Sequence, residues 1–547
     1  PETFGGYFDS GSTWTTNSLT ETRKDDYHVT SQVIANYMGT FGSHDLTVMA
    51  GFENYYMKDE ELTAARDKYE LTGYPYLNIG SEDFQTNSGK GSEYTSNSVF
   101  GRVIYSYADR YLFQANIRHD GSSRFAKGYR WGTFPSFSAG WVMSEEKFMK
   151  SLNWDWLSFL KLRGSWGILG NERIGDDYFP YIALMSFGNS LFYMADGSVV
   201  SDKTARPAIL AVEDITWETT TSTDFGLDAN FFNNRLQFHF DYYWKQTKDM
   251  LLKIEIPYFM GYNNPNTNAG KMSTHGYDIE LAWNDRIGDL QYGVNVNFSD
   301  FLSKIDYMND GEQISNGKIK RAGVLFNEYY GYVCDGIYQT QEEVNNSART
   351  STTVTVGDLK YRDISGPDGV PDGIISPEYD RVPLGNSLPR FQYGGTFNAS
   401  YKGIDFSIAF QGIGKQNSYL STAMVQPLRD NYGSVPSIIE GKYWSPFNTA
   451  EENLSARYPR LSNVSKSNNY ATSNFWMFNG SYFRLKNLTL GYTLPETWTQ
   501  KAGIDRVRFY ISGSDLFCLS NFPDGWDPEM GASSYPITTS LVMGLQV

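Results

Sequence analysis

Hydrophobic and polar residues alternate strictly along many short segments of this chain. Within residues 290–299, an apolar set alternates with a polar set: Leu290, Tyr292, Val294, Val296 and Phe298 against Gln291, Asn295, Asn297 and Ser299. Successive side chains of a β-strand point to opposite faces, so a period of two indicates a strand with one dry face and one wet face. No helical period competes with this pattern.

The same alternation recurs along the chain and predicts an all-β protein. The predicted strands are fifteen segments, at about residues 27–39, 44–58, 97–107, 111–120, 133–142, 159–168, 220–231, 235–246, 275–284, 290–301, 392–401, 404–413, 481–493, 506–516 and 536–547.

The connections between these strands are either very short or very long. Residues 232–234, 285–289 and 402–403 predict hairpin turns, whereas the long connections cover about 169–219, 246–274, 303–391, 413–480 and 518–535. Short periplasmic turns and long extracellular loops are typical of outer-membrane proteins. The pattern therefore predicts a transmembrane antiparallel β-barrel.

The composition agrees with a β-barrel and argues against two other classes of protein, helical membrane proteins and nucleic-acid-binding proteins. Aromatic residues make up 16% of the chain, which suits the rings of aromatic side chains found at lipid headgroups. The mean hydropathy is -0.46, and no apolar run approaches the roughly 20 residues of a membrane-spanning helix. A net charge of -16 argues against nucleic acid, which calls for a basic surface.

The strand count leads to an expectation about the rest of the barrel. If short turns face the periplasm, an odd number of strands requires at least one earlier strand. The sequence also opens on barrel-like residues without a signal peptide. We therefore expect residues 1–547 to be the C-terminal part of a larger barrel, and the strand at 27–39 to pair with an earlier one.

Six motifs, in this order, carry a resemblance to a known family. They are Ile117–Phe125, Pro135–Trp141, Leu162–Gly167 with Gly170–Asn171, Asn268–Gly270, Pro389–Gly394 and Tyr482–Tyr492. From about residue 97 to the C-terminus, the chain resembles the SusC/RagA-type TonB-dependent transporters.

This resemblance implies a location, partners and a function. Members of the family have a 22-stranded barrel with an N-terminal plug. About fifteen of these strands are expected in residues 1–547, and the plug, the TonB box and the first strands are expected to lie outside them. It works in the bacterial outer membrane with a SusD-type surface lipoprotein and the TonB–ExbB–ExbD complex. The implied function is active import of a bulky nutrient. We prefer an oligosaccharide, with an oligopeptide importer or a non-transporting glycan-binding receptor as alternatives.

The sequence does not single out cargo-binding residues. Polar-face positions either touch cargo or solvate the lumen, and we prefer the second interpretation for Asp241, His239, Asn295, Asn297 and Arg508. Loop aromatics either stack on sugar rings, pack against a lid or pack within the loops, and we prefer the third for Tyr329, Tyr330, Tyr332, Tyr443, Trp444 and Trp476.

One loop has residues suited to a metal ion. Asp363, Asp368, Asp372 and Asp380 lie among glycines, and clustered carboxylates on such a loop favour calcium. Their spacing fits an EF-hand imperfectly, and the alternative is an ordinary turn rich in Asp, Gly and Pro. We hypothesise a calcium ion held by some of these four residues, and expect no required cofactor.

Catalytic motifs and a disulfide framework are not evident. The sequence has no Gly-x-Ser-x-Gly, His-Glu-x-x-His or phosphate-loop motif, so we predict that the protein is not an enzyme. Pairs of carboxylates for glycoside hydrolysis remain open, because the distance between two such groups is invisible in the sequence. Cys334 and Cys518 are expected to be unpaired packing residues.

Overall fold

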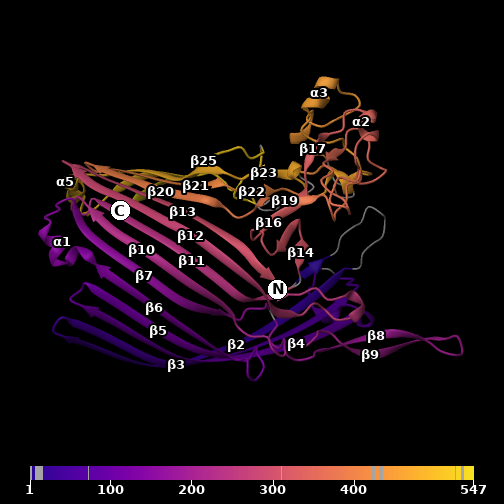
Figure 1. The fold of residues 1–547 in the computed structure, drawn as a ribbon, viewed down its shortest axis with the longest axis horizontal. Helices are drawn as coiled ribbons and strands as arrows, with labels where there is room; N and C mark the ends of the chain where they lie inside the picture. Colours follow the sequence, from indigo (N-terminus) through magenta and orange to yellow (C-terminus); the bar gives the residue numbers. More distant parts are fainter. Residues whose placement is uncertain are drawn as a thin grey trace. The chain divides into compact units, whose positions relative to one another are not determined.

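The computed structural model of the chain is dominated by one large antiparallel sheet (Figure 1). It describes residues 3–5, 17–71, 73–175, 177–309, 311–421, 425–429, 435, 437–523, 525–530 and 535–547. Within these ranges no helix is long and apolar enough to cross a membrane.

Sixteen strands form the main sheet, and strands that follow one another in this list pair with each other. They are β1 (Thr3–Gly5), β2 (Ser18–Phe41), β3 (His44–Asp67), β4 (Gln85–Tyr107), β5 (Tyr111–Ser122), β6 (Trp131–Val142), β7 (Leu157–Asn171), β10 (Glu218–Phe231), β11 (Leu236–Lys253), β12 (Asn266–Ile287), β13 (Leu290–Met308), β20 (Arg390–Tyr401), β21 (Ile404–Lys415), β24 (Tyr482–Thr493), β25 (Arg508–Ser520) and β26 (Ser540–Gln546).

The fifteen predicted strands are confirmed, and β1 is an additional strand that the pattern did not predict. Most strands are longer than predicted, chiefly on the side of the long connections. Strand β4, for example, begins at Gln85 instead of residue 97, and residues 85–91 of this extension are exposed. Both faces of such an extension are wet, so its sequence is polar throughout and loses the alternation that identified the rest of the strand.

The predicted hairpin turns are also confirmed. Lys402 and Gly403 connect β20 to β21 with φ values of 46° and 87°, as expected for a two-residue turn that matches the strand twist. The turn predicted at 285–289 is shorter than expected, because β12 continues to Ile287 and leaves only Gly288 and Asp289.

The chain divides into two compact units, which are described separately. Unit 1 comprises residues 1–139, 166–221 and 247–269, and unit 2 comprises residues 140–165, 222–246 and 270–547. In unit 1, strands β2 to β5 pair in register. A small core of Phe125, Ile215 and Trp217 packs against Phe134 of β6 and Leu251 of β11. The hairpin of β8 (Met185–Tyr193) and β9 (Val199–Pro207) forms a separate two-stranded sheet.

Unit 2 contains an apolar band that runs in register across neighbouring strands. Val294 on β13 pairs with Phe397 on β20, which pairs with Ile408 on β21. Further along, Leu490 on β24 pairs with Ile511 on β25, and both side chains are about half exposed. The dry faces predicted separately for each strand therefore join into one continuous apolar surface.

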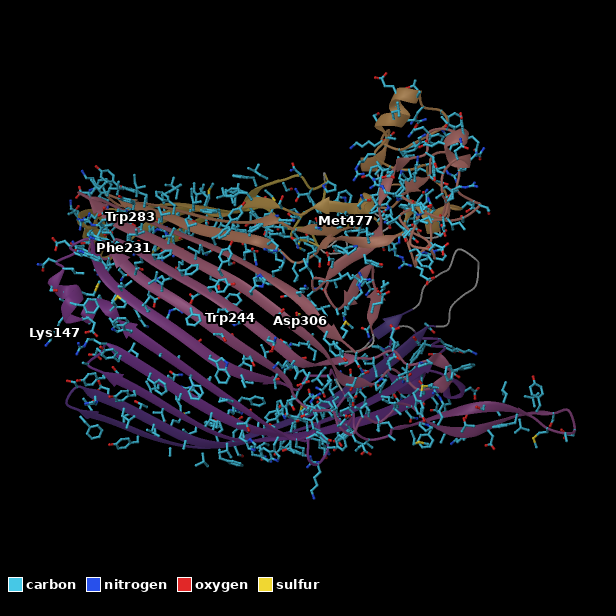
Figure 2. All side chains as sticks on the ribbon, viewed as in Figure 1. Lys147, Phe231, Trp244, Trp283, Asp306 and Met477 are labelled. Carbon is cyan, nitrogen blue, oxygen red and sulfur yellow. The ribbon has the colours of Figure 1, made fainter. Side chains whose placement is uncertain are left out.

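Aromatic side chains gather where the strands of unit 2 meet the short turns. Phe231 and Trp283 lie at this end (Figure 2). The ring of Trp156 stacks on Phe231 with centroids 5.8 Å apart, and Trp154 stacks on Trp156 at 5.3 Å. Exposed tryptophans in such a row suit the girdle at a lipid headgroup layer.

The long connections of unit 2 fold into a module with its own core, seen with α2, α3 and β17 in Figure 1. We call the described residues of 309–389 and 416–481 the loop module. Its core contains Tyr332, Leu359, Tyr361 and Trp476. Its elements are β14 (Glu312–Ser315), β15 (Lys318–Arg321), β16 (Glu328–Tyr332), β17 (Cys334–Ile337), α2 (Gln341–Asn345), β18 (Leu359–Tyr361), β19 (Arg381–Asn386), β22 (Asn417–Tyr419), α3 (Ala450–Ser455), α4 (Lys466–Asn469) and β23 (Met477–Asn479).

Two short helices occupy the turn ends of unit 2. Helix α1 (Lys147–Ser151) lies between β6 and β7, and α5 (Glu496–Thr499) lies between β24 and β25. Each replaces a tight turn by a slightly longer connection.

Candidate functional site

The polar face of the sheet carries a charged network centred on Arg163 of β7. Its guanidinium donates to both carboxylate oxygens of Asp241 on β11, with Nη2 to Oδ2 at 2.7 Å, and Nε donates to Asp228 on β10 at 3.2 Å. His239 Nδ1 lies 3.0 Å from the other oxygen of Asp228. One arginine thus connects the polar faces of three strands.

A glycine makes this arrangement possible. A Cβ atom on Gly226 of β10 would collide with the Arg163 guanidinium, so the missing side chain opens the path from β7 to β11. Neighbouring strands lie about 4.8 Å apart, so an arginine that reaches the next strand but one must cross the strand between them. The small residue is therefore part of the network.

The same arrangement recurs elsewhere on the polar face of unit 2. Arg508 of β25 donates Nε to Asp405 of β21 at 2.9 Å. Its path crosses β24 at Gly491, where an added Cβ would lie 2.5 Å from Arg508 Nη2.

In unit 1 a serine takes the place of the glycine. Arg118 of β5 crosses β4 at Ser98, donating to its hydroxyl at 2.8 Å and to Glu53 of β3 at 3.0 Å. Ser98 pairs directly with Glu53 in the register of β3 and β4. Cross-strand arginines over small residues are thus a repeated feature of the polar face.

The polar-face positions predicted from the sequence belong mainly to these contacts. Asp241, His239 and Arg508 take part in the networks described above, and Asn295 donates to Glu280 at 2.9 Å. Asn297 lies beside Gly394, in register across β13 and β20. Arg163 was not identified from the sequence as the centre of this network. The signal that could have identified it is an arginine on the polar face of a strand near Asp228 and Asp241, which lie on the polar faces of the next two strands.

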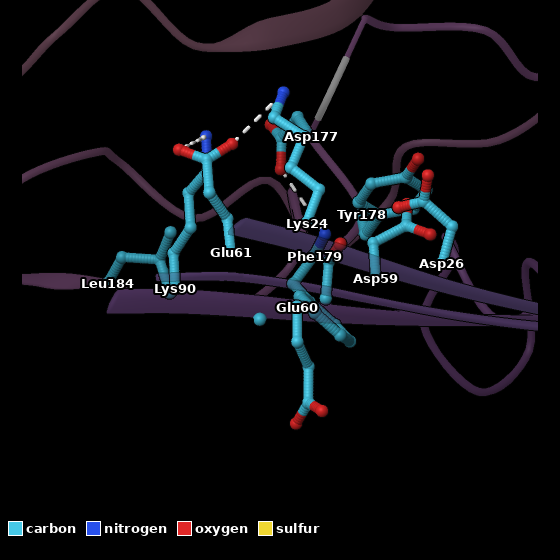
Figure 3. A pocket seen from close by; sticks show the side chains of 12 residues that line it. Lys24, Asp26, Asp59, Glu60, Glu61, Lys90, Asp177, Tyr178, Phe179 and Leu184 are labelled. Carbon is cyan, nitrogen blue, oxygen red and sulfur yellow. Dashed lines mark hydrogen bonds and ion pairs between the residues drawn. The ribbon is translucent and has the colours of Figure 1, made fainter. Parts of the chain in front are cut away.

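A charged cavity of about 470 Å³ lies against β2, β3 and β4 in unit 1 (Figure 3). Lys24 and Lys90 both pair with Glu61, at 3.1 and 3.5 Å. Asp26 and Asp59 face each other in register, whereas the Glu60 side chain points away from the others. Tyr178 closes one side, with Arg124 4.4 Å above its ring. Charged side chains predominate in its lining, and its two lysines balance part of its acidic charge.

The loop aromatics pack mostly within the loop module, as preferred from the sequence. Tyr329, Tyr330 and Tyr332 are each less than one-tenth exposed, and Trp476 is fully buried. Tyr443 and Trp444 are half-buried. Tyr329, Tyr330, Tyr332 and Trp476 are therefore buried within the module and present little ring surface to a sugar or a lid.

The Asp-rich loop is held by its own backbone. Fully buried Asp380 accepts hydrogen bonds from the N–H groups of Ile364 and Ser376 at 2.7 Å. Asp363 accepts from Gly373 at 2.7 Å, and Asp372 from Ile374 at 2.9 Å. In contrast, Asp368 is exposed. Among the described residues no three His, Cys, Asp or Glu side chains converge as a metal site would require.

Both cysteines are free, as expected. Cys334 lies in β17 of the loop module, and its thiol donates to the carbonyl of Gly336 at 3.3 Å. Burial raises the pKa of this thiol to about 11. Cys334 is therefore a packing residue that stays protonated at neutral pH.

Comparison with known proteins connects this architecture to membrane receptors. The chain is 29% identical over 555 residues to TonB-dependent receptor P3 of Formosa agariphila, with 94% of the chain and 52% of the relative covered. It is 28% identical over 539 residues to TonB-dependent receptor SusC of Bacteroides thetaiotaomicron, with 95% and 50% covered. The chain thus spans about half the length of these relatives.

A solved structure and a family model agree with these relatives. The structure of the RagAB peptide transporter matches with a TM-score of 0.80 and 22% identity, covering 98% of this chain and 57% of the other. Residues 2–512 match the family described as "TonB dependent receptor-like, beta-barrel", which begins earlier than the motifs indicated. The SusC/RagA-type resemblance is confirmed, and the chain belongs to the TonB-dependent receptor-like β-barrel family of the bacterial outer membrane.

Proposed function

We propose that the protein imports a bulky nutrient across the outer membrane by TonB-dependent transport, and that this nutrient is an oligosaccharide. The observation that carries this proposal is the two-faced sheet within the family just identified. Its apolar band suits contact with lipid, and its other face has the polar groups that a hydrated solute needs.

The chemistry of the polar face favours a neutral, hydroxyl-rich cargo. Its principal arginines are engaged by carboxylates of the wall, as Arg163 is by Asp241 and Arg508 by Asp405. The same face has hydroxyls that hydrogen-bond each other, such as Thr489 on β24 with Ser512 on β25 at 2.8 Å. Amides and hydroxyls both donate and accept hydrogen bonds, which matches the hydroxyl groups of sugars.

Two relatives suggest partners and the principal alternative cargo. SusC is a TonB-dependent receptor by name, and RagAB is named as a peptide transporter. We propose that this protein likewise works with a SusD-type surface lipoprotein and is energised by the TonB–ExbB–ExbD complex. An oligopeptide importer of the same family is the alternative, and a non-transporting glycan-binding receptor is another.

Titration calorimetry of the complete transporter tests this proposal. The detergent-purified protein, with any lipoprotein that co-purifies, is titrated with parallel panels of oligosaccharides and oligopeptides. Binding of one class of glycan linkage, together with uptake of that glycan that stops when TonB is deleted, would support import. Peptide binding alone would favour the oligopeptide alternative, and glycan binding without TonB-dependent uptake would favour a receptor.

We retain calcium as a proposal for the Asp-rich loop. It is supported by Asp363, whose Oδ1 is buried and has no hydrogen-bond partner among the described residues. The opposing consideration is that Asp380 already accepts backbone hydrogen bonds at both oxygens. Calorimetry with millimolar calcium tests the proposal, and a signal that survives in a variant combining Asp363→Asn, Asp368→Asn and Asp372→Asn would place the ion elsewhere.

A further inference from the structure

We infer that a cleft in unit 1, between residues 173–175 and 177–184 on one side and 251–266 on the other, binds a segment of an oligosaccharide. This inference rests on the proposed function and adds a location for cargo recognition. The cleft has a volume of about 1040 Å³. That is just above the roughly 300 to 1,000 Å³ of clefts that enclose small-molecule ligands.

One wall of the cleft is fixed by a buried arginine. Arg124 is 8% exposed, and its Nη1 donates to the carbonyls of Gly175 and Asp177 at 3.1 and 3.0 Å. Gly175 and Asp177 both line the cleft. Hydrogen bonds from a charged donor are stronger than neutral ones, so this wall is held in place without a ligand.

The opposite wall is fixed at several points. The backbone N–H of Asn263 donates to the carbonyl of Ala208 at 2.9 Å, and that of Ile256 donates to Asn264 Oδ1 at 3.2 Å. Arg206 donates to the carbonyl of Gly261 at 2.7 Å. A cleft whose two walls are already ordered loses little conformational entropy when it binds.

The lining of the cleft combines amides, a ring and apolar side chains. Asn263, Asn266 and Tyr262 contribute from one wall, and half-buried Leu251 and Leu252 contribute apolar surface. Within the part of the chain that the structure describes, the side-chain amides of Asn263 and Asn266 make no hydrogen bond to the protein. Each such amide offers two donors and an acceptor.

This combination fits a sugar better than other polar solutes. Neighbouring hydroxyls of a pyranose can donate to and accept from one amide, while the ring of Tyr262 can cover the C–H face of the sugar. Arg173, Lys253 and Asp177 also line the cleft, two cations and one carboxylate. The cleft therefore accepts a neutral sugar, and one acidic group can lie near Arg173.

Binding measurements on two independent variants test the inference. We would titrate the complete detergent-purified transporter, with its co-purified lipoprotein, with neutral and uronate-containing oligosaccharides of four to six units. The Asn263→Ala/Asn266→Ala double variant should weaken binding by roughly four- to a hundredfold, since each of two lost hydrogen bonds reduces affinity by roughly two- to tenfold. Tyr262→Ala should weaken it separately, because it removes the ring.

Matched controls come from the exposed β8–β9 hairpin. Asn189 and Tyr193 are exposed and do not line the cleft, so Asn189→Ala and Tyr193→Ala should bind as the unaltered protein does. Unchanged mobility of unboiled protein on gels would show that each variant folds.

The outcomes separate this inference from the proposed function. Oligosaccharide binding that is equal in the unaltered protein and in both cleft variants would overturn the inference and leave import of glycans intact. Peptides that bind and lose affinity in the same variants would overturn the sugar assignment. If the unaltered protein with its lipoprotein binds no oligosaccharide, the proposed function fails and the inference fails with it.

Discussion

Single small residues decide which charges meet on the polar face. Arg163 and Arg508 each reach a carboxylate two strands away, and each crosses a glycine, Gly226 or Gly491. Arg118 crosses Ser98, whose hydroxyl accepts a hydrogen bond from it. A larger residue at these positions would hold the guanidinium away from its partner. These glycines therefore leave space for an arginine side chain to reach its carboxylate, in addition to any effect that they have on the backbone.

Gly226→Ala should destabilise the protein by about 1 to 3 kcal/mol, because it displaces Arg163 from a charged hydrogen-bond pair with Asp241. Denaturant unfolding in detergent measures this change. Gly89→Ala is the matched control, since a Cβ on this strand residue would come no closer than 3.6 Å to another atom. If the two variants lose equal stability, the glycine acts through its backbone and the crossing interpretation is wrong.

A double-mutant cycle isolates the coupling between these residues. With Arg163→Ala already in place, Gly226→Ala should cost much less than it does in the unaltered protein, because the collision is gone. Additive effects would contradict a direct contact.

The thiol of Cys334 should react slowly with alkylating reagents. Thiolate is the reactive form, and a pKa raised to about 11 means that the thiol remains protonated below that pH. In a Cys518→Ser variant, modification by iodoacetamide at pH 8 should be on the order of a hundredfold slower than for an exposed cysteine, since only about 0.1% is thiolate. The rate should increase as the pH approaches 11. Rapid modification at pH 8 in folded protein would contradict the burial of this thiol.

At the level of elements, alternation identified the strands only where one face is apolar. Strand β13 shows the pattern from Leu290 to Ser299 and is observed to continue to Met308. The polar extensions of β3 and β4, by contrast, lie outside the predicted strands at 44–58 and 97–107. Hydrogen bonding between neighbours holds these extensions together, as in the pairing of Glu61 with Lys90. A pattern that reports burial cannot detect strands that are wet on both faces.

The loop module should depend on one buried ion pair. Asp358 is fully buried and accepts from Arg460 at 2.7 Å, Ser465 at 2.8 Å and Asn469 at 2.9 Å. Removing one partner of a buried pair typically costs about 3 to 5 kcal/mol, because the other charge remains buried alone. Asp358→Ala should therefore open the module, and limited proteolysis should cut it faster than the strands.

The exposed pair of Arg362 and Asp335 provides the comparison. Their side chains are 59% and 32% exposed, so Asp335→Ala should change stability by no more than about 1 kcal/mol. Equal proteolysis of the two variants would show that the module does not rely on Asp358.

For the molecule as a whole, the sequence was sufficient for the fold and insufficient for the site. The two-residue period specifies a face for each residue, so it placed Asp241, His239 and Arg508 together on the polar side. It does not specify which residues face each other across neighbouring strands. That information comes from the pairing register of neighbouring strands. The register of β21 and β24, for example, places Asp405 directly opposite Gly491. Contacts within the long loops, such as those of Asp358, lie about one hundred residues apart and leave no local pattern.

The two faces of the sheet should respond differently to the same added charge. Val294 lies within the apolar band, paired with Phe397 and Trp283, whereas its neighbour Asn295 lies on the polar face near Glu280. An arginine on the lipid face costs about 2 to 4 kcal/mol near the middle of a bilayer and about 0 to 1 kcal/mol at its interfaces. Val294 pairs with Trp283 toward the turn end of the strand, so Val294→Arg should cost an amount between these limits and reduce assembly into heat-modifiable protein in the outer membrane. Asn295→Arg should assemble normally, because its guanidinium can pair with Glu280. Because the two positions are adjacent, they share strand, depth and backbone pairing, and only the face differs. Equal assembly of both variants would mean that the apolar band does not contact lipid.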